Sequence, residues 1–202
     1  MKKAAIWLLS VLMLCLMTAT ALAAADSEKI LKEQREINAL SDKALASLYE
    51  KVPSSRKVIQ NCYAYATLSN TGIKLGLFGD AHGRGLAINN ATGEKVYMRM
   101  NEMGLGLGLG VKEYDLIFVI ETAPAWYSFI SGEIKFATSA EAAARDGKTG
   151  DSLEGASLAA DGVWVYQITK KGLTLDASIK GTKIYPYKKL NQEVDKSKEP
   201  VA

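Results

Sequence analysis

Residues 103–111 read Met-Gly-Leu-Gly-Leu-Gly-Leu-Gly-Val, so leucine and glycine alternate with a period of two. This is the period of a β-strand, in which successive side chains point to opposite faces. One face carries Leu105, Leu107 and Leu109, whereas the other carries only glycine and lets a facing layer approach closely. The pattern predicts a central strand of a curved sheet. Close packing explains its glycines better than a bound ligand does.

The first 23 residues have the pattern of a secretory signal peptide. Two lysines precede an apolar run over residues 4–16, and an Ala-Leu-Ala sequence at residues 21–23 supplies the small residues that signal peptidase reads. The run is shorter than the roughly 20 apolar residues of a membrane-spanning helix. We therefore expect cleavage after residue 23 or 25 and a periplasmic or secreted product. Lipidation of Cys15 is the alternative, which the bulky Leu14 disfavours.

The charge of the mature chain is close to neutral. The full chain of 202 residues has a formal net charge of +3, and losing Lys2 and Lys3 with the leader lowers it to +1. Strong sequence-independent binding to nucleic acid is therefore not expected, and a membrane contact needs a local group of cations. Cys62 is the only cysteine left, which excludes an intramolecular disulfide and a cysteine-ligated zinc site. We expect it to be a small buried hydrophobe.

Residues 26–52 have the pattern of an amphipathic helix. The pattern allows a cap at Asp26 or Ser27, an end at Pro53 and a break near Ser41 that would start a second helical segment. Mixed charges on the polar positions favour an inner face that lies on the domain, although a membrane-surface role is the alternative. The apolar positions recur at helical spacing: Ile30, Ile37, Leu40, Ala44 and Leu48.

From residue 63 onward, strand and turn signals dominate. We expect a short helical turn at residues 56–61, a turn at Asn70-Thr71-Gly72 and a glycine-rich loop through residues 79–85. Residues 114–120 form an apolar run interrupted only by Asp115, as in a strand buried on both faces. The expected strands cover residues 73–78, 85–89, 95–100, 114–120 and 163–169, with a hairpin loop at 90–93 and a hairpin partner at 173–179.

A second helix is predicted to start after Thr122, which caps it, and to end at Gly132, with Pro124 in its first turn. Residues 139–147 carry conflicting signals for helix and strand, and residues 146–151 form a polar loop. From residue 187 the tail is charged, and we expect it to be loosely ordered.

Few residues suggest chemistry. Asp80, His82 and Arg84 alternate in the glycine-rich loop, but a metal site needs further ligands and this is the only histidine. A surface histidine on a loop is the better interpretation. No Gly-x-Ser-x-Gly elbow is present, and the glycine runs do not fit a dinucleotide or phosphate loop. We therefore expect no catalytic residues, no metal, no cofactor and no enzymatic activity.

Several segments resemble the bacterial branch of the SYLF lipid-binding domain family, over roughly residues 44–185. The resemblance rests on order and spacing along most of the mature chain. These segments are Thr92-Gly93 with Tyr97-Met98-Arg99-Met100, Gly104 to Gly108 with Val111-Lys112, Leu116 to Ile120 followed by the Trp126 and Phe129 helix, Tyr166-Gln167-Ile168-Thr169, Gly172-Leu173 and Lys180-Gly181-Thr182-Lys183.

The resemblance implies a non-enzymatic lipid-binding module with a mostly β fold preceded by helices. Eukaryotic relatives bind phosphoinositides and have actin-related partners, which a secreted bacterial-type protein would not meet. The resemblance also favours strand over helix at residues 141–145. Two departures affect the ligand: Tyr65-Ala66 stands where many members have Phe-Pro, and the segment 78–85 is longer than usual.

Together these observations predict an α+β domain with a mostly antiparallel, curved or barrel-like sheet preceded by N-terminal amphipathic helices. The expected boundaries are a signal peptide at 1–23, a helical segment at 24–53, a SYLF-like domain at 54–186 and a tail at 187–202. The predicted partner is a phospholipid or membrane surface. The other hypothesis is a structural or interaction scaffold of the cell envelope. Candidate lipid-headgroup ligands are Lys74, Arg84, Lys95 and Arg99.

Overall fold

The described part of the chain is an α+β domain built on one antiparallel sheet, as the sequence predicts. The computed structural model describes residues 2–75, 78–104, 110–136, 153–169, 172–174 and 182–192. Within these ranges, the backbone alone is described for residues 2–25, 71–82, 102–112 and 174.

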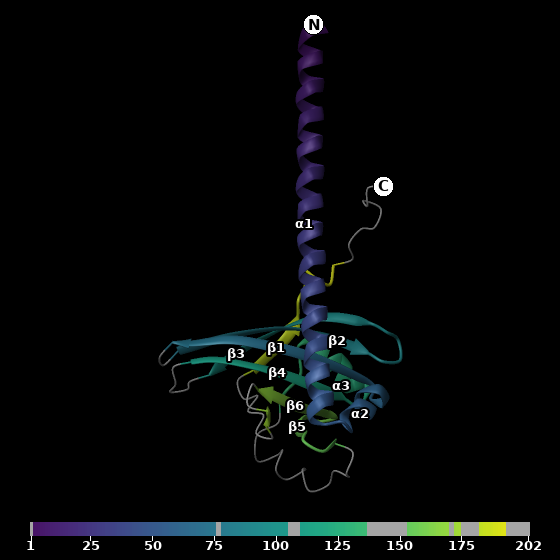
Figure 1. Cartoon of the computed structure of the whole chain (residues 1–202). Helices are drawn as coiled ribbons and strands as arrows, with labels where there is room; N and C mark the ends of the chain where they lie inside the picture. The colour runs from purple at the N-terminus through teal and green to yellow at the C-terminus, as the bar shows by residue number, and fades with distance from the viewer. Residues whose placement is uncertain are drawn as a thin grey trace.

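The eight-stranded sheet curls into a half-barrel (Figure 1). Its order is β5-β6-β4-β1-β2-β3-β8, and β7 pairs with β6. The long β1–β2 hairpin occupies the centre, so β1 has hydrogen-bonded neighbours on both sides along most of its length. The strands are β1 (Ala64–Leu75), β2 (Phe78–Asn89), β3 (Lys95–Gly104), β4 (Gly110–Ile120), β5 (Ser157–Ala160), β6 (Val163–Thr169), β7 (Gly172–Thr174) and β8 (Thr182–Pro186).

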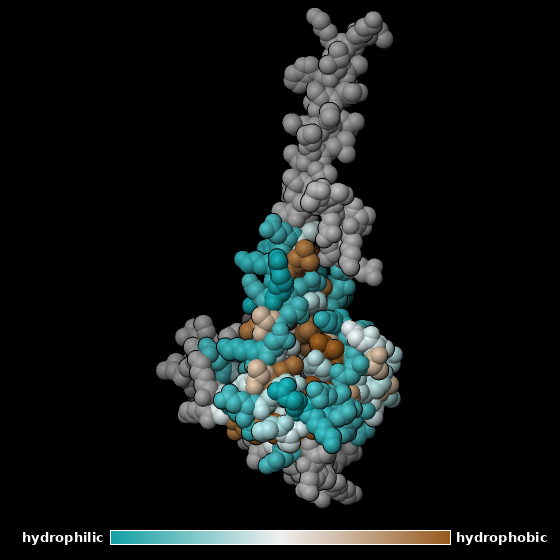
Figure 2. All heavy atoms as spheres, turned by 45° about the vertical axis from the view of Figure 1, so that its right-hand side comes forward, coloured by the Kyte–Doolittle hydropathy of each residue, from teal (hydrophilic) through white to brown (hydrophobic). Residues whose placement is uncertain are grey.

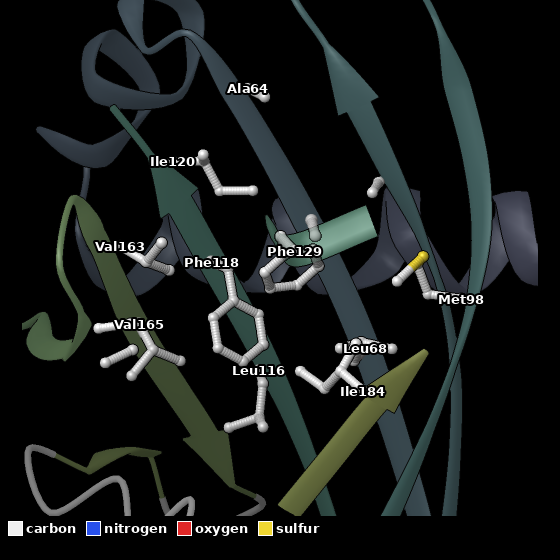
Figure 3. Close-up of a cluster of buried hydrophobic side chains, with 14 of the residues drawn as sticks. Ala64, Leu68, Met98, Leu116, Phe118, Ile120, Phe129, Val163, Val165 and Ile184 are labelled. Atoms are coloured by element: carbon white, nitrogen blue, oxygen red, sulfur yellow. The ribbon is translucent and has the colours of Figure 1, made fainter. Parts of the chain in front are cut away.

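One face of the sheet is covered by α3 (Ala123–Ser131), as Figure 3 shows for Phe129 beside the strand side chains. The Thr122 hydroxyl accepts a hydrogen bond from the Ala125 amide, and Gly132 ends the helix at φ 80°. Both confirm the predicted caps. The fully buried Trp126 and Phe129 pack on alternating strand residues, among them Ala64, Leu68, Met98, Leu116, Phe118, Ile120, Val163, Val165 and Ile184.

The opposite face is covered by α1 (Lys2–Lys51) and α2 (Ser55–Asn61), and α1 continues past the sheet as a projecting rod (Figure 1). Ile37, Ala44 and Leu48 are fully buried, so the predicted apolar stripe does lie on the domain. The Thr67 hydroxyl of β1 donates to the Ser41 hydroxyl of α1 at 2.7 Å, and both groups are buried. This pair fixes the helix at one position on the sheet.

Two details predicted for α1 are wrong. The helix is continuous through Ser41, because that hydroxyl bonds to Thr67 in the sheet instead of capping a second helical segment. In the chain that retains residues 2–25, Asp26 and Ser27 do not cap the start of the helix, since it extends back to Lys2 and preceding turns supply their backbone partners. The helix does end just before Pro53, as expected.

Two predicted interruptions of the sheet are also wrong. Asn70, Thr71 and Gly72 lie inside β1, paired with β2 on one side and β4 on the other. Residues 79–85 are not a loop but part of β2, paired with β1 and β3 throughout. Pairing on two sides overrides local turn preferences, which weigh only about 1 kcal/mol each. The loop at residues 90–93 is confirmed: the Asn89 side chain accepts from two loop amides, and Gly93 has φ 72°.

The glycine-rich stretch is not one central strand. β3 ends at Gly104 and β4 begins at Gly110, and the order of the sheet places β1 and β2 between them. Gly104 pairs with Gly79, which pairs with Lys74, which pairs with Gly110. The stretch therefore contains the ends of two separate strands, and residues 105–109 lie outside the described part.

The two edge strands β5 and β8 were not predicted. β8 pairs with β3, and the chain after it remains attached to the body through residues 187–192, so the expected loose tail cannot begin at Tyr187. Leu190 is 1% exposed, and the Asn191 side chain bonds to the backbone of Tyr97. The antiparallel pairing of β6 with β7 confirms the first part of the predicted hairpin between residues 163–169 and 173–179. Residues 139–151 lie outside the described part.

Candidate functional site

A row of polar side chains crosses the α1-covered face. The strand register places Asp115, Ser69, Arg84, Arg99 and Tyr185 side by side on neighbouring strands. Ser69 donates to the Asp115 carboxylate at 2.6 Å. Directly opposed residues have Cβ atoms about 5 Å apart, so Arg84 and Arg99 form a local concentration of positive charge.

Both arginines already have partners. Arg84 Nη1 lies 3.3 Å from a carboxylate oxygen of Glu36 on α1, with each side chain nearly half exposed. The Arg99 guanidinium stacks on the Tyr187 ring at 3.7 Å from its centre. The Tyr187 hydroxyl donates to the Glu33 carboxylate of α1 at 3.3 Å. These contacts attach α1 and the segment after β8 to the sheet, and they leave part of each guanidinium at the surface.

Of the four predicted headgroup ligands, the structure places Arg84 and Arg99 side by side and Lys95 farther along the same strand as Arg99. Lys95 lies on the same face of β3 as Arg99, four residues earlier and about 13 Å along the strand. Lys74 lies elsewhere: its backbone is five ladder positions beyond the Ser69–Arg84 pair, about 17 Å away. Strand pairing thus separates Lys74 from the other three.

Other cations lie near Arg99 because β8 is its neighbour. Lys183 is opposite Asn101 in β8, and Lys188 and Lys189 follow in the turn after Tyr187, all three exposed. We call these three residues, with Lys95 and Arg99, the basic edge. Acidic residues also lie near it: Glu94 precedes Lys95, Glu33 contacts Tyr187, and the backbone of Glu102 in β3 pairs with Thr182 beside Lys183. Sequence reasoning missed Lys183, Lys188 and Lys189 because β8 itself was missed. The close spacing of these three lysines after residue 182 was the sequence signal that could have identified them.

A second feature is an open pocket of about 650 Å³ at the corner where α2 meets the ends of β1 and β4. Its apolar wall comes from Val58, Cys62, Tyr63, Val119 and Leu153. Its polar lining comes from Ser54, Lys57, Asn61 and Glu121. The volume falls in the range of small-molecule sites, roughly 300–1,000 Å³.

Burial favours the neutral form of the thiol in this pocket. Cys62 Sγ donates to the carbonyl oxygens of Ile59 and Ala64 at 3.2 and 3.1 Å. Burial raises its pKa to about 11, so the neutral thiol dominates at physiological pH. The predicted role of Cys62 as a small apolar residue is consistent with this environment, although its side chain is only partly buried.

The histidine motif is not on a mobile loop. His82 occupies a β2 position paired with Thr71 and Asn101. Among side chains that the structure describes, no three of His, Cys, Asp and Glu cluster closely enough to hold a metal ion. No helix within the described ranges combines the length and apolar character needed to cross a membrane. Figure 2 shows a largely hydrophilic surface along α1, with hydrophobic patches where it joins the body.

The described part of the chain is thus a curled sheet between two helical layers, with a charged edge and an open pocket that is partly apolar. A family model described as "Las17-binding protein actin regulator" (Ysc84) matches residues 101–199. A relative from Aeromonas veronii, beta cell expansion factor A, is 33% identical over 165 residues, which cover 81% of this chain and 61% of the relative. The chain belongs to the SYLF-domain family, which is known as lipid-binding. It spans about three fifths of the length of that relative.

Proposed function

We propose that the mature chain is a non-enzymatic module of the cell envelope that binds the surface of anionic phospholipid membranes through the basic edge. The signal-peptide pattern of residues 1–23 supports export to the periplasm or beyond. Family membership supports lipid as the ligand class. The observation that carries the proposal is the concentration of five cations along β3, β8 and the following turn in a nearly neutral protein.

Electrostatic attraction to an anionic leaflet contributes about 1 kcal/mol for each Lys or Arg held near the surface. Lys95, Lys183 and Lys188 are exposed, so their charge is accessible to phosphate groups. Arg99 is fixed by stacking on Tyr187, which reduces the entropy lost when it contacts a headgroup. Arg84 is farther inside the row, and its contact with Glu36 gives it a second role in holding α1.

The same lysines also protect an edge strand. Charged residues and Pro186 on β8 hinder pairing with another chain, which is a general use of lysine at sheet edges. A scaffold of the envelope would need these lysines only for that purpose. The two functions differ in their response to lipid charge, so a vesicle experiment separates them.

The test is sedimentation of purified protein with vesicles of phosphatidylglycerol and phosphatidylcholine. The variant Lys95→Gln/Lys183→Gln/Lys188→Gln should lose about 3 kcal/mol of binding free energy, roughly two orders of magnitude in partition coefficient at low salt. The matched control is Lys32→Gln/Lys43→Gln/Lys135→Gln, which removes three exposed lysines elsewhere and should bind nearly as wild type. Equal binding by both triple variants would refute the basic edge as the membrane contact.

Export and cleavage of the leader are tested separately, by the intact mass of the protein. The intact mass of the protein recovered from the periplasm or medium of its producing cell should correspond to a chain starting at residue 24 or 26. A mass that retains Cys15 with an attached diacylglycerol would show a lipoprotein instead, and the membrane association would then have a covalent origin.

A further inference from the structure

The corner pocket opens onto the margin of a core. Val119 is 1% exposed and belongs to the core cluster between the sheet and α1 and α2. Val58, Cys62 and Leu153 pack against the same cluster but are only partly buried. Among described residues, the pocket therefore exposes apolar side chains that belong to the core, and an apolar occupant would remove them from water.

The pocket has a polar rim on the side of α2. Lys57 is exposed on the helix and lines the pocket, with Ser54 and Asn61 beside it. Asn61 Nδ2 donates to the Lys57 carbonyl oxygen at 2.7 Å, so the rim belongs to the helix itself. Glu121 is the acidic group of the lining. Arg56 stacks on Tyr49 at 4.3 Å and adds a second cation on the same turn.

We propose that this pocket binds the acyl chain of a single-chain anionic amphiphile, with Lys57 holding its charged head. A single hydrocarbon chain fits an apolar pocket of this volume, and one lysine at the mouth matches one anionic group. The chemistry is shared by a free fatty acid and by a lysophospholipid. The site is separate from the basic edge, so it does not depend on the vesicle-binding proposal and can fail or succeed independently.

Glu121 makes it possible to test the sign of the charge on the bound head group. An anionic head near the rim is attracted by Lys57 and repelled by Glu121. Removing the lysine should weaken binding, and removing the carboxylate should strengthen it, each by about two- to five-fold as for other exposed charge pairs. Lys51 is an exposed lysine at the end of α1 that does not line the pocket, and it supplies the matched control.

The experiment is titration calorimetry of the purified protein with palmitate, palmitoyl lysophosphatidate and uncharged hexadecanol. We expect one equivalent of an anionic amphiphile to bind, and hexadecanol to bind more weakly. Palmitate alone, lysophosphatidate alone or both would identify the source of the chain. Lys57→Gln should weaken binding, Glu121→Gln should strengthen it, and Lys51→Gln should leave it within two-fold of wild type.

A blocking variant tests the location. Asn61→Trp places a large side chain at the rim from an exposed helix position and should abolish binding. The second variant, Val58→Trp, places a large side chain at the apolar wall of the pocket. Either variant counts as evidence only if its melting curve matches that of the wild-type protein. Absence of binding by the wild-type protein, or binding that survives both folded blocking variants, would overturn the proposal. Equal affinity for hexadecanol would overturn the role of Lys57.

Discussion

Gly85 lies in β2 directly against the backbone of β1. It pairs with Leu68 on β1, and a Cβ atom added to it would lie 2.8 Å from Leu68 Cα and would overlap the Thr67 carbonyl oxygen. Both neighbours are backbone atoms of a strand that is paired on two sides. Since neither can rotate away, Gly85→Ala must separate β1 from β2 locally.

The magnitude follows from two opposing terms. Overpacking of a rigid interior typically costs about 1–3 kcal/mol, and a backbone contact belongs at the upper end. Replacing glycine also restricts the unfolded chain, which offsets about 0.4–1 kcal/mol. We expect Gly85→Ala to lose about 2–3 kcal/mol of unfolding free energy. For a chain of this size, that lowers Tm by about 4–12 °C.

Gly83 is the control two residues away on the same strand. A Cβ atom there would meet Met100 Cε at 2.7 Å, Met100 Cβ at 3.1 Å and, less closely than at Gly85, the β1 backbone at the Ser69 carbonyl oxygen at 3.3 Å. The methionine end can move because it is unbranched and flexible, so Gly83→Ala should lose only about 0–1 kcal/mol. Urea unfolding of both variants measures the difference. Equal stability losses, or a wild-type Tm for Gly85→Ala, would refute the argument that the backbone of β1 sets the cost.

Three further predictions concern buried groups. Ser41→Ala leaves the Thr67 hydroxyl without its partner and should cost about 1–3 kcal/mol in urea unfolding, whereas adding Thr67→Val should recover part of the loss. A loss in the double variant equal to the sum of both single losses would contradict this coupling. Cys62 should react with iodoacetamide far more slowly than free cysteine at pH 8, because a pKa of about 11 leaves about one thiolate in a thousand. A rate equal to that of free cysteine would disprove its burial. Burial raises the pKa of Tyr166 to about 12, so stability is unaffected by this group below pH 10 and falls as pH rises from 10 to 12, where the unfolded chain ionises more readily than the buried phenol. The Tyr166 hydroxyl has no hydrogen-bond partner among described residues, so Tyr166→Phe should keep or raise stability at pH 7 and shift alkaline unfolding upward. A lower Tm at pH 7 would show that the hydroxyl has a stabilising contact.

The position of α1 links the fold to the proposed function. Glu36 and Glu33 connect the helix to Arg84 and, through Tyr187, to Arg99. Gln34 Nε2 also donates to the Leu190 carbonyl oxygen at 2.8 Å. Arg84 and Arg99 thus also help to join α1 to the sheet, whereas Lys95, Lys183 and Lys188 are exposed farther along the edge. This division is why the vesicle test changes lysines and leaves Arg84 unchanged.

Much of the architecture could be predicted from local sequence signals. The apolar stripe of residues 30–48 determined which face of α1 is buried, and Thr122 and Gly132 fixed the ends of α3. The apolar run before residue 120 formed a buried strand, and its content of β-branched and aromatic residues explains this directly. In each case the signal and the interaction lie within a few residues of each other.

Tertiary pairing decided the rest. Asn70-Thr71-Gly72 has turn chemistry but lies within β1, because ladders to both β2 and β4 outweigh a local preference. The basic edge exists because β8 returns about 85 residues later to pair with β3, and no local pattern specifies that partner. Lys74 was grouped with Arg84 in the prediction, yet strand register alone sets their separation. Sequence determines which residues can form a strand face, whereas the long-range ladder determines which charges meet on it.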